Sequence, residues 1–255
     1  MKIQQLLEAD AYRFQPDWVN NDEPNIRMTA RASRKSSSSP IEAYGLAYGM
    51  ELNGVECPRR WKSTFATTNP RKSHFMNYVD KAGLRKLAIP NGAKIATVEN
   101  DFNMHSNFSS SLINLNGSMH DIATSLQYKL DDDPNLTELK SVIHDIQEWR
   151  KAYLTLYKED GSDHGYEWFK ELLEDYDKVI QMDVVGRHLI PDEILGMGTA
   201  KAAIRDQIEN VLDSHRVRVF NSIDEVPAGS FEVWFEGEYA AQALSPEEHS
   251  AFTKK

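Results

Sequence analysis

Two basic stretches hold the side chains of this chain that are best suited to binding a negatively charged ligand. The first, Met-Thr-Ala-Arg-Ala-Ser-Arg at 28–34, contains Arg31, Ser33 and Arg34, and the second is Arg-Arg-Trp-Lys-Ser-Thr at 59–64. Between residues 27 and 94 there are thirteen Lys and Arg against four Asp and Glu, although the whole chain has a net charge of −10. This concentration of positive charge predicts contact with a polyanion, such as a dinucleotide pyrophosphate or a nucleic acid.

Two neighbouring hydroxyl residues and a glutamate near the end of the chain follow the first arginines in sequence. Ser63 and Thr64 lie in Trp-Lys-Ser-Thr-Phe, and Glu232 lies in Gly-Ser-Phe-Glu-Val-Trp-Phe, directly after the turn-like segment 227–230. An arginine, a Ser-Thr pair and a glutamate in this order, each on a predicted strand, resemble the mono-ADP-ribosyltransferases of the Arg-Ser-Glu type. The resemblance is to divergent phage and bacterial members, and it covers about 27–108 and 216–239.

The resemblance implies an enzyme that uses NAD+ as substrate and transfers ADP-ribose to a macromolecular acceptor, which is a host protein or a nucleic acid. Cleavage of the nicotinamide–ribose bond passes through an oxocarbenium-like ribose, and Glu232 would stabilise that positive charge. Arg31 would grip the pyrophosphate, and Ser63 would hold the orientation of Glu232. The residues expected to bind NAD+ are Arg31, Ser33, Arg34, Ser63 and Thr64.

Two further acidic residues compete with Glu232 for the catalytic role. The segment 231–238 reads Phe-Glu-Val-Trp-Phe-Glu-Gly-Glu, so Glu236 and Glu238 have the Glu-x-Glu spacing that resembles the arginine-modifying branch of the family. Glu232 is preferred because it opens the apolar strand directly after the turn, as the catalytic glutamate of the family does. With Glu232 in that role the arginine-specific signature is missing, so the acceptor stays open.

One part of the chain has short apolar runs separated by turn-forming residues, and another has apolar residues at helical spacing. Together they predict an α+β fold with a split sheet. Strands are predicted at 26–32, 63–67, 84–89, 94–98, 216–220 and 230–235, and helices at 41–50, 70–81, 139–156, 166–180 and 199–212. The predicted organisation is a leader segment at 1–26, the first half of an α+β NAD-binding core at 27–116, an acidic helical insertion at 117–215, and the second half of the core with a tail at 216–255. The resemblance implies an ADP-ribosyltransferase-like core around that insertion.

Composition places the protein among globular cytoplasmic proteins. Cys57 is the only cysteine, which excludes an intramolecular disulfide, and the first ten residues lack the apolar core of a signal peptide. We expect no membrane association and a location in the cytoplasm, that of the host bacterium if the gene is carried by a phage. The histidines have no metal-ligand spacing, so no metal site is predicted.

A binding module of phage or bacterial origin is the alternative from another functional class. In that reading the basic face at 27–94 docks on nucleic acid or protein, with Trp61, Phe65, Phe75 and Tyr78 as stacking groups. The late carboxylate discriminates between the two readings, because a phosphate-binding surface gains nothing from a neighbouring negative charge. The enzyme reading requires Glu232 to lie close to Arg31 and Ser63 in the fold.

Overall fold

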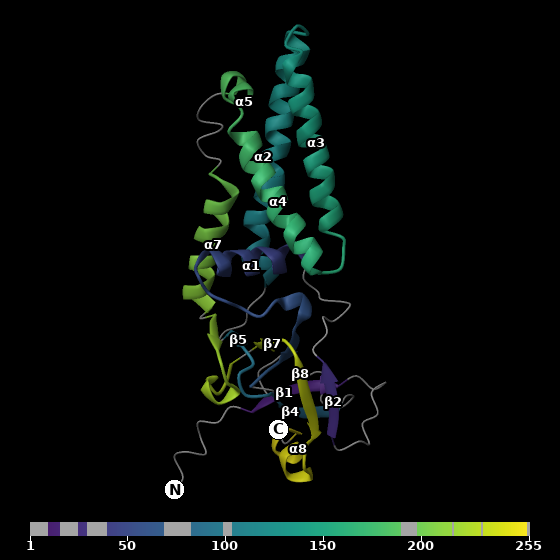
Figure 1. The fold of residues 1–255 in the computed structure, drawn as a ribbon, viewed down its shortest axis with the longest axis vertical. Coiled ribbons are helices and arrows are strands. Elements are labelled where there is room, and N and C mark those ends of the chain that lie inside the picture. The colour runs from purple at the N-terminus through teal and green to yellow at the C-terminus, as the bar shows by residue number, and fades with distance from the viewer. Residues whose placement is uncertain are drawn as a thin grey trace. The chain divides into compact units, whose positions relative to one another are not determined.

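The chain forms two compact units, which we call the sheet unit and the helical unit (Figure 1). The computed structural model describes residues 10–15, 25–29, 40–68, 83–98, 104–189, 198–215, 217–230 and 232–253. The sheet unit comprises 1–34, 54–103 and 211–255, and the helical unit comprises 35–53 and 104–210. Each unit therefore draws on segments that are distant in sequence.

The sheet unit contains two four-stranded sheets, in which all the described strand pairs are antiparallel. The order in the first sheet is β1 (Ala11–Gln15), β4 (Gly83–Ala88), β8 (Glu238–Ala243) and β2 (Asn25–Thr29). The order in the second sheet is β3 (Thr64–Ala66), β7 (Glu232–Phe235), β5 (Ile95–Val98) and β6 (Arg218–Phe220). Both sheets thus combine early and late strands. The predicted mixture of helices and β-strands is confirmed, and the strands form two antiparallel sheets.

The core of the sheet unit lies between the inner faces of its two sheets. Alternate residues of each strand point to opposite faces, so β7 sends Val233 and Phe235 inward. They pack against Leu87, Tyr239 and other buried residues of the first sheet. A backbone bridge between Tyr12 and Thr67 also joins the sheets, with N–H···O distances of 2.8 and 2.9 Å.

The helical unit is built from amphipathic helices whose apolar faces meet. Its helices are α1 (Pro40–Leu52), α2 (Met104–Asp132), α3 (Glu138–Leu156), α4 (Asp163–Ile180), α5 (Asp183–His188) and α7 (Ala200–His215), the last of which continues into the sheet unit. Helix α3 packs against both α2 and α4, and the Trp149 indole N–H donates to the Leu172 carbonyl at 2.7 Å. The side chain of Ser162 caps α4 by accepting from the Gly165 N–H at 2.9 Å.

Several predicted boundaries differ from the structure. The segment 1–26, predicted to be a leader, contains strand β1, which pairs along its whole length with β4. The insertion predicted at 117–215 begins earlier, because α2 starts at Met104. The helical unit also includes α1, whose buried side chains on several sides require helices around them, although 27–116 was assigned to the core. The tail contains two further elements, β8 and α8 (Pro246–Thr253). The helix predicted at 70–81 lies outside the described residues.

Among the helices that the structure describes, none has both the length and the apolar character needed to cross a membrane.

Close packing of α1 against α7 makes Gly49 a sensitive position. A methyl group at Gly49 would lie 1.9 Å from Ile208 Cγ1, whose β-branched side chain has little freedom in a helix. We expect Gly49→Ala to lower the stability of the helical unit by about 1–3 kcal/mol, measured by helix circular dichroism during denaturation. The matched control is Gly117→Ala in α2, where nothing lies within 4 Å of the new methyl group. This control should be neutral or stabilising, and equal effects of the two substitutions would contradict the packing described.

Candidate functional site

The candidate site is built on the pairing of β3 with β7, which brings the Ser63–Thr64 segment beside the strand that Glu232 opens. Phe65 pairs with Trp234, and Thr64 pairs with Phe235. Because side chains alternate along a strand, Phe65, Trp234 and Glu232 share the outer face of this sheet, opposite Val233 and Phe235. On that face Trp234 is fully buried, whereas Glu232 is partly exposed. Thr64 points to the inner face with Phe235.

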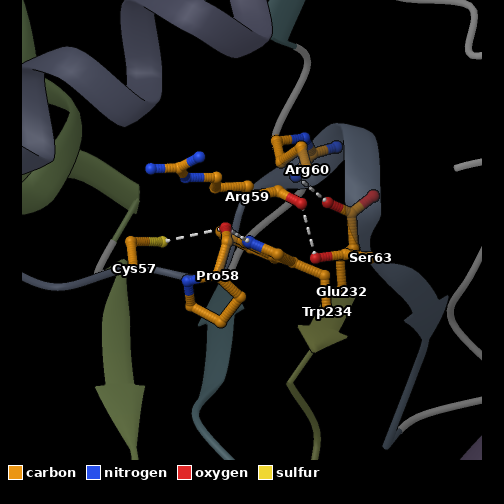
Figure 2. A network of polar contacts seen from close by, with 7 residues as sticks. All are labelled: Cys57, Pro58, Arg59, Arg60, Ser63, Glu232 and Trp234. Atoms are coloured by element: carbon orange, nitrogen blue, oxygen red, sulfur yellow. Dashed lines mark hydrogen bonds and ion pairs between the residues drawn. The ribbon is translucent and has the colours of Figure 1, made fainter. Parts of the chain in front are cut away.

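The side chain of Arg60 covers this outer face. Arg60 lies in a short 3₁₀ helix, Arg60–Lys62, directly before β3, and its Nη1 donates to Glu232 Oε1 at 2.6 Å (Figure 2). The guanidinium carbon lies 4.6 Å from the Phe65 ring centroid and 4.8 Å from that of Trp234. Such contacts with aromatic faces are worth about 0.5–2 kcal/mol each, according to how far the cation is desolvated. Arg60 and Glu232 side chains are 12% and 25% exposed, so the ion pair still reaches solvent.

Three hydrogen bonds fix the backbone that carries Arg60. The Trp234 indole N–H donates to the Pro58 carbonyl at 3.0 Å, and the Ser63 hydroxyl donates to the Arg59 carbonyl at 2.8 Å (Figure 2). The Arg59 backbone N–H donates to the Glu236 carboxylate. The segment 58–63 is therefore held by Trp234, by Glu236 and by its own internal bond, and the Arg60 side chain projects from a fixed backbone.

The positions of Ser63 and Thr64 differ from the roles expected of them. Ser63 is completely buried, and its hydroxyl bonds to the Arg59 carbonyl, whereas the partner of Glu232 is Arg60. Thr64 is also buried, on the inner face, where its Oγ1 accepts from Arg13 Nη1 at 3.2 Å. Ser63 thus stabilises the turn before β3, whereas Thr64 bonds on the inner face of the strand.

Arg13 is a cation that the sequence did not single out. It belongs to β1, in the segment assigned to the leader, and its Nη1 also donates to the Tyr239 hydroxyl at 2.9 Å. Its hydrogen-bond partners among the described residues are therefore two neutral hydroxyls. The alternation of Ala-Tyr-Arg-Phe-Gln at 11–15 was the available signal that this segment is a strand.

The three acidic residues of 232–238 lie in distinct environments. Glu236 accepts the Arg59 N–H and so helps to fix the loop, while Gly237, with φ +95°, turns the chain into the other sheet. Glu238 is exposed at the start of β8 and lines a groove of about 470 Å³. The other lining residues are Arg27, Met28, Ala88, Ile89, Pro90, Tyr239 and Ala240. Glu232, in contrast, pairs with the Arg60 guanidinium.

Other predicted site residues are described in part or not at all. Arg31, Ser33 and Arg34 lie outside the described residues, as do Phe75 and Tyr78 of the alternative reading. Trp61 is 6% exposed, which leaves it unable to stack on a base from solvent. Within the described ranges no group of His, Cys, Asp and Glu side chains has the arrangement needed to hold a metal ion.

The chemistry of this face follows from its two charges. A partly exposed carboxylate can stabilise a positive charge that develops beside it, and a guanidinium can bind an anion through several N–H donors. In the ion pair each group neutralises the other, so either function requires the pair to open. The fold and the site define a mixed α and β protein with an antiparallel sheet unit and a charged, aromatic-lined outer face. Comparison with known protein families, curated proteins and solved structures gives no match to this chain.

The reactivity of the Cys57 thiol depends on how tightly the loop that carries Arg60 is packed. Burial raises the pKa of Cys57 to about 12, although nearby Arg60 acts in the opposite direction, and Sγ donates to the Pro58 carbonyl at 3.6 Å. Because the thiolate is the reactive form, we expect iodoacetamide to alkylate native Cys57 at pH 8 on the order of a hundredfold more slowly than the denatured chain. Mass spectrometry measures the rate, with Cys57→Ser as the unlabelled control. Equal rates in native and denatured protein would mean that this loop opens readily.

Proposed function

We propose that the sheet unit transfers ADP-ribose from NAD+ to a macromolecular acceptor, with Glu232 at the reacting ribose. The observation that carries the proposal is the pairing of β3 with β7, which joins distant parts of the sequence. It sets a partly exposed carboxylate on the same face as an arginine of the basic region, at 2.6 Å. A nucleic-acid docking surface would gain nothing from this carboxylate, whereas glycosyl transfer requires one.

The proposed reaction breaks the bond between ribose C1′ and the nicotinamide ring nitrogen. The electron pair of that bond passes to the nitrogen, so nicotinamide leaves as a neutral molecule and positive charge develops on the ribose. Glu232 would stabilise this charge and accept hydrogen bonds from the ribose hydroxyls, an interaction that strengthens in the transition state. An acceptor nucleophile then bonds to C1′ and loses its proton.

The environments of the three carboxylates support Glu232 for this role. Glu236 is engaged by the Arg59 backbone, and Glu238 lies across the Gly237 turn in the other sheet. Glu232 pairs with the guanidinium of Arg60 and keeps a quarter of its side chain exposed. We assign the pyrophosphate to the basic region, with Arg31 as the residue implied by the family resemblance. The acceptor is a protein side chain or a nucleic acid, and the proposed setting is the bacterial cytoplasm, with the gene carried by a phage.

The proposal predicts that the protein releases nicotinamide from NAD+ and that the release depends on Glu232. Glu232→Gln keeps the shape of the side chain but removes the negative charge, so we expect activity to fall by about 10²–10³-fold. Glu238→Gln is the matched control and should keep most of the activity. Nicotinamide is measured by chromatography, and transfer is followed with labelled NAD+ in a bacterial lysate.

The same assay contains the outcomes that would contradict the proposal. Absence of both nicotinamide release and label transfer from the wild-type protein would remove the enzymatic function. Retention of activity in Glu232→Gln with loss in Glu238→Gln would move the reacting centre to the groove at β8. Salt-sensitive binding of nucleic acid without NAD+ cleavage would favour the binding module instead.

A further inference from the structure

The contact between Arg60 and Glu232 opposes the role proposed for Glu232. A carboxylate that accepts from a guanidinium at 2.6 Å has most of its negative charge balanced before any ribose arrives. Stabilisation of an oxocarbenium-like ribose requires that charge to be available. If the proposed function holds, a productive complex needs another anion to attract Arg60.

The surroundings of Arg60 suit an exchange of partners. Among the hydrogen bonds of the described residues, the guanidinium makes one, from Nη1 to Glu232, although it has five N–H donors. Phe65 and Trp234 contact it through their ring faces, and these contacts fix no single hydrogen-bond direction. The backbone on either side is held by Glu236 and Ser63, so a movement would be confined to the side chain.

We propose that Arg60 is a phosphate-binding residue that exchanges partners, pairing with Glu232 in the empty protein and with a phosphate of the dinucleotide in the complex. The exchange couples binding to chemistry, because Glu232 regains its charge only when a phosphate holds Arg60. The ligand class is a nucleoside diphosphate group, which a planar guanidinium binds through two parallel hydrogen bonds. The catalytic consequence of this inference rests on the proposed function. The contact between Arg60 and a phosphate does not depend on it.

Binding of ADP tests the phosphate contact without any catalysis. In the full-length protein, Glu232→Gln removes the internal competitor for Arg60, so ADP should bind about three- to tenfold more tightly by titration calorimetry. Arg60→Gln should weaken binding about tenfold or more, and the double variant should match Arg60→Gln. Lys62→Gln makes the same change of charge two residues away and should have a smaller effect.

Activity on two substrates tests the exchange. Nicotinamide riboside contains the scissile bond but no phosphate, so in the wild-type protein it leaves Arg60 on Glu232. Arg60→Gln should therefore lower kcat/KM for NAD+ and raise it for nicotinamide riboside. A residue with only a structural role would lower both values, and Arg60→Lys, which keeps a point charge, should fall between the wild type and Arg60→Gln.

The outcomes separate this inference from the proposed function. If Glu232→Gln leaves ADP binding unchanged, or Arg60→Gln lowers activity equally on both substrates, the exchange of partners is wrong. If the ADP pattern appears but neither substrate releases nicotinamide, the phosphate contact stands and the transferase function fails. Near-ultraviolet circular dichroism checks folding, and if Arg60→Gln is misfolded, the Arg60→Lys and Glu232→Gln comparisons carry the test.

Discussion

The antiparallel pairing of β7 with β3 on one side and β5 on the other is the constraint on which the candidate site depends. The register sets Trp234 opposite Phe65 and Ala96, and this fixes which face each residue of β7 presents. A shift by one residue would turn Glu232 toward the core between the sheets and Phe235 to the opposite face. Burial of Val233 and Phe235 between the sheets therefore specifies the outward position of Glu232.

Electrostatics and aromatic packing act together on that outer face. A guanidinium that is 12% exposed would be costly without a counter-charge, and Glu232 supplies one. The rings of Phe65 and Trp234 stabilise the cation further, and the Trp234 N–H anchors the Pro58 carbonyl. The result is a charged pair that can be stable without a ligand and still contacts solvent.

The sequence predicted well those elements whose local pattern and final environment agree. The apolar run at 232–235 and the Ser-Thr segment were recognised as strands from their Val, Phe and Trp residues. Strand β8 was missed because Glu-Tyr-Ala-Ala-Gln-Ala is poor in β-branched residues, and its position between β4 and β2 outweighs that composition. The early part of α2 is rich in Ser and Asn, which predict turns, yet it continues the helix that packs on α3.

The site was predictable only in part, for a related reason. Glu232 and the Ser-Thr pair could be selected by chain order and strand context, and the structure sets their strands side by side. Arg60 could not, because its contact with Glu232 depends on a 3₁₀ turn that folds back over the partner strand. Arg13 could not be selected either, because its contacts with Thr64 and Tyr239 join strands β1, β3 and β8, which are far apart in the sequence.

The positions of β7 and β8 within the sheets also bear on how the protein is made. Each is an internal strand, flanked on both sides by strands that leave the ribosome earlier. The second sheet therefore stays incomplete until synthesis has passed residue 235, and the first until it has passed residue 243, whereas the described helices of the helical unit precede both strands in the chain. Folding of the sheet unit must wait until after that point, and a nascent chain that is interrupted before it would present unpaired strand edges to the cell.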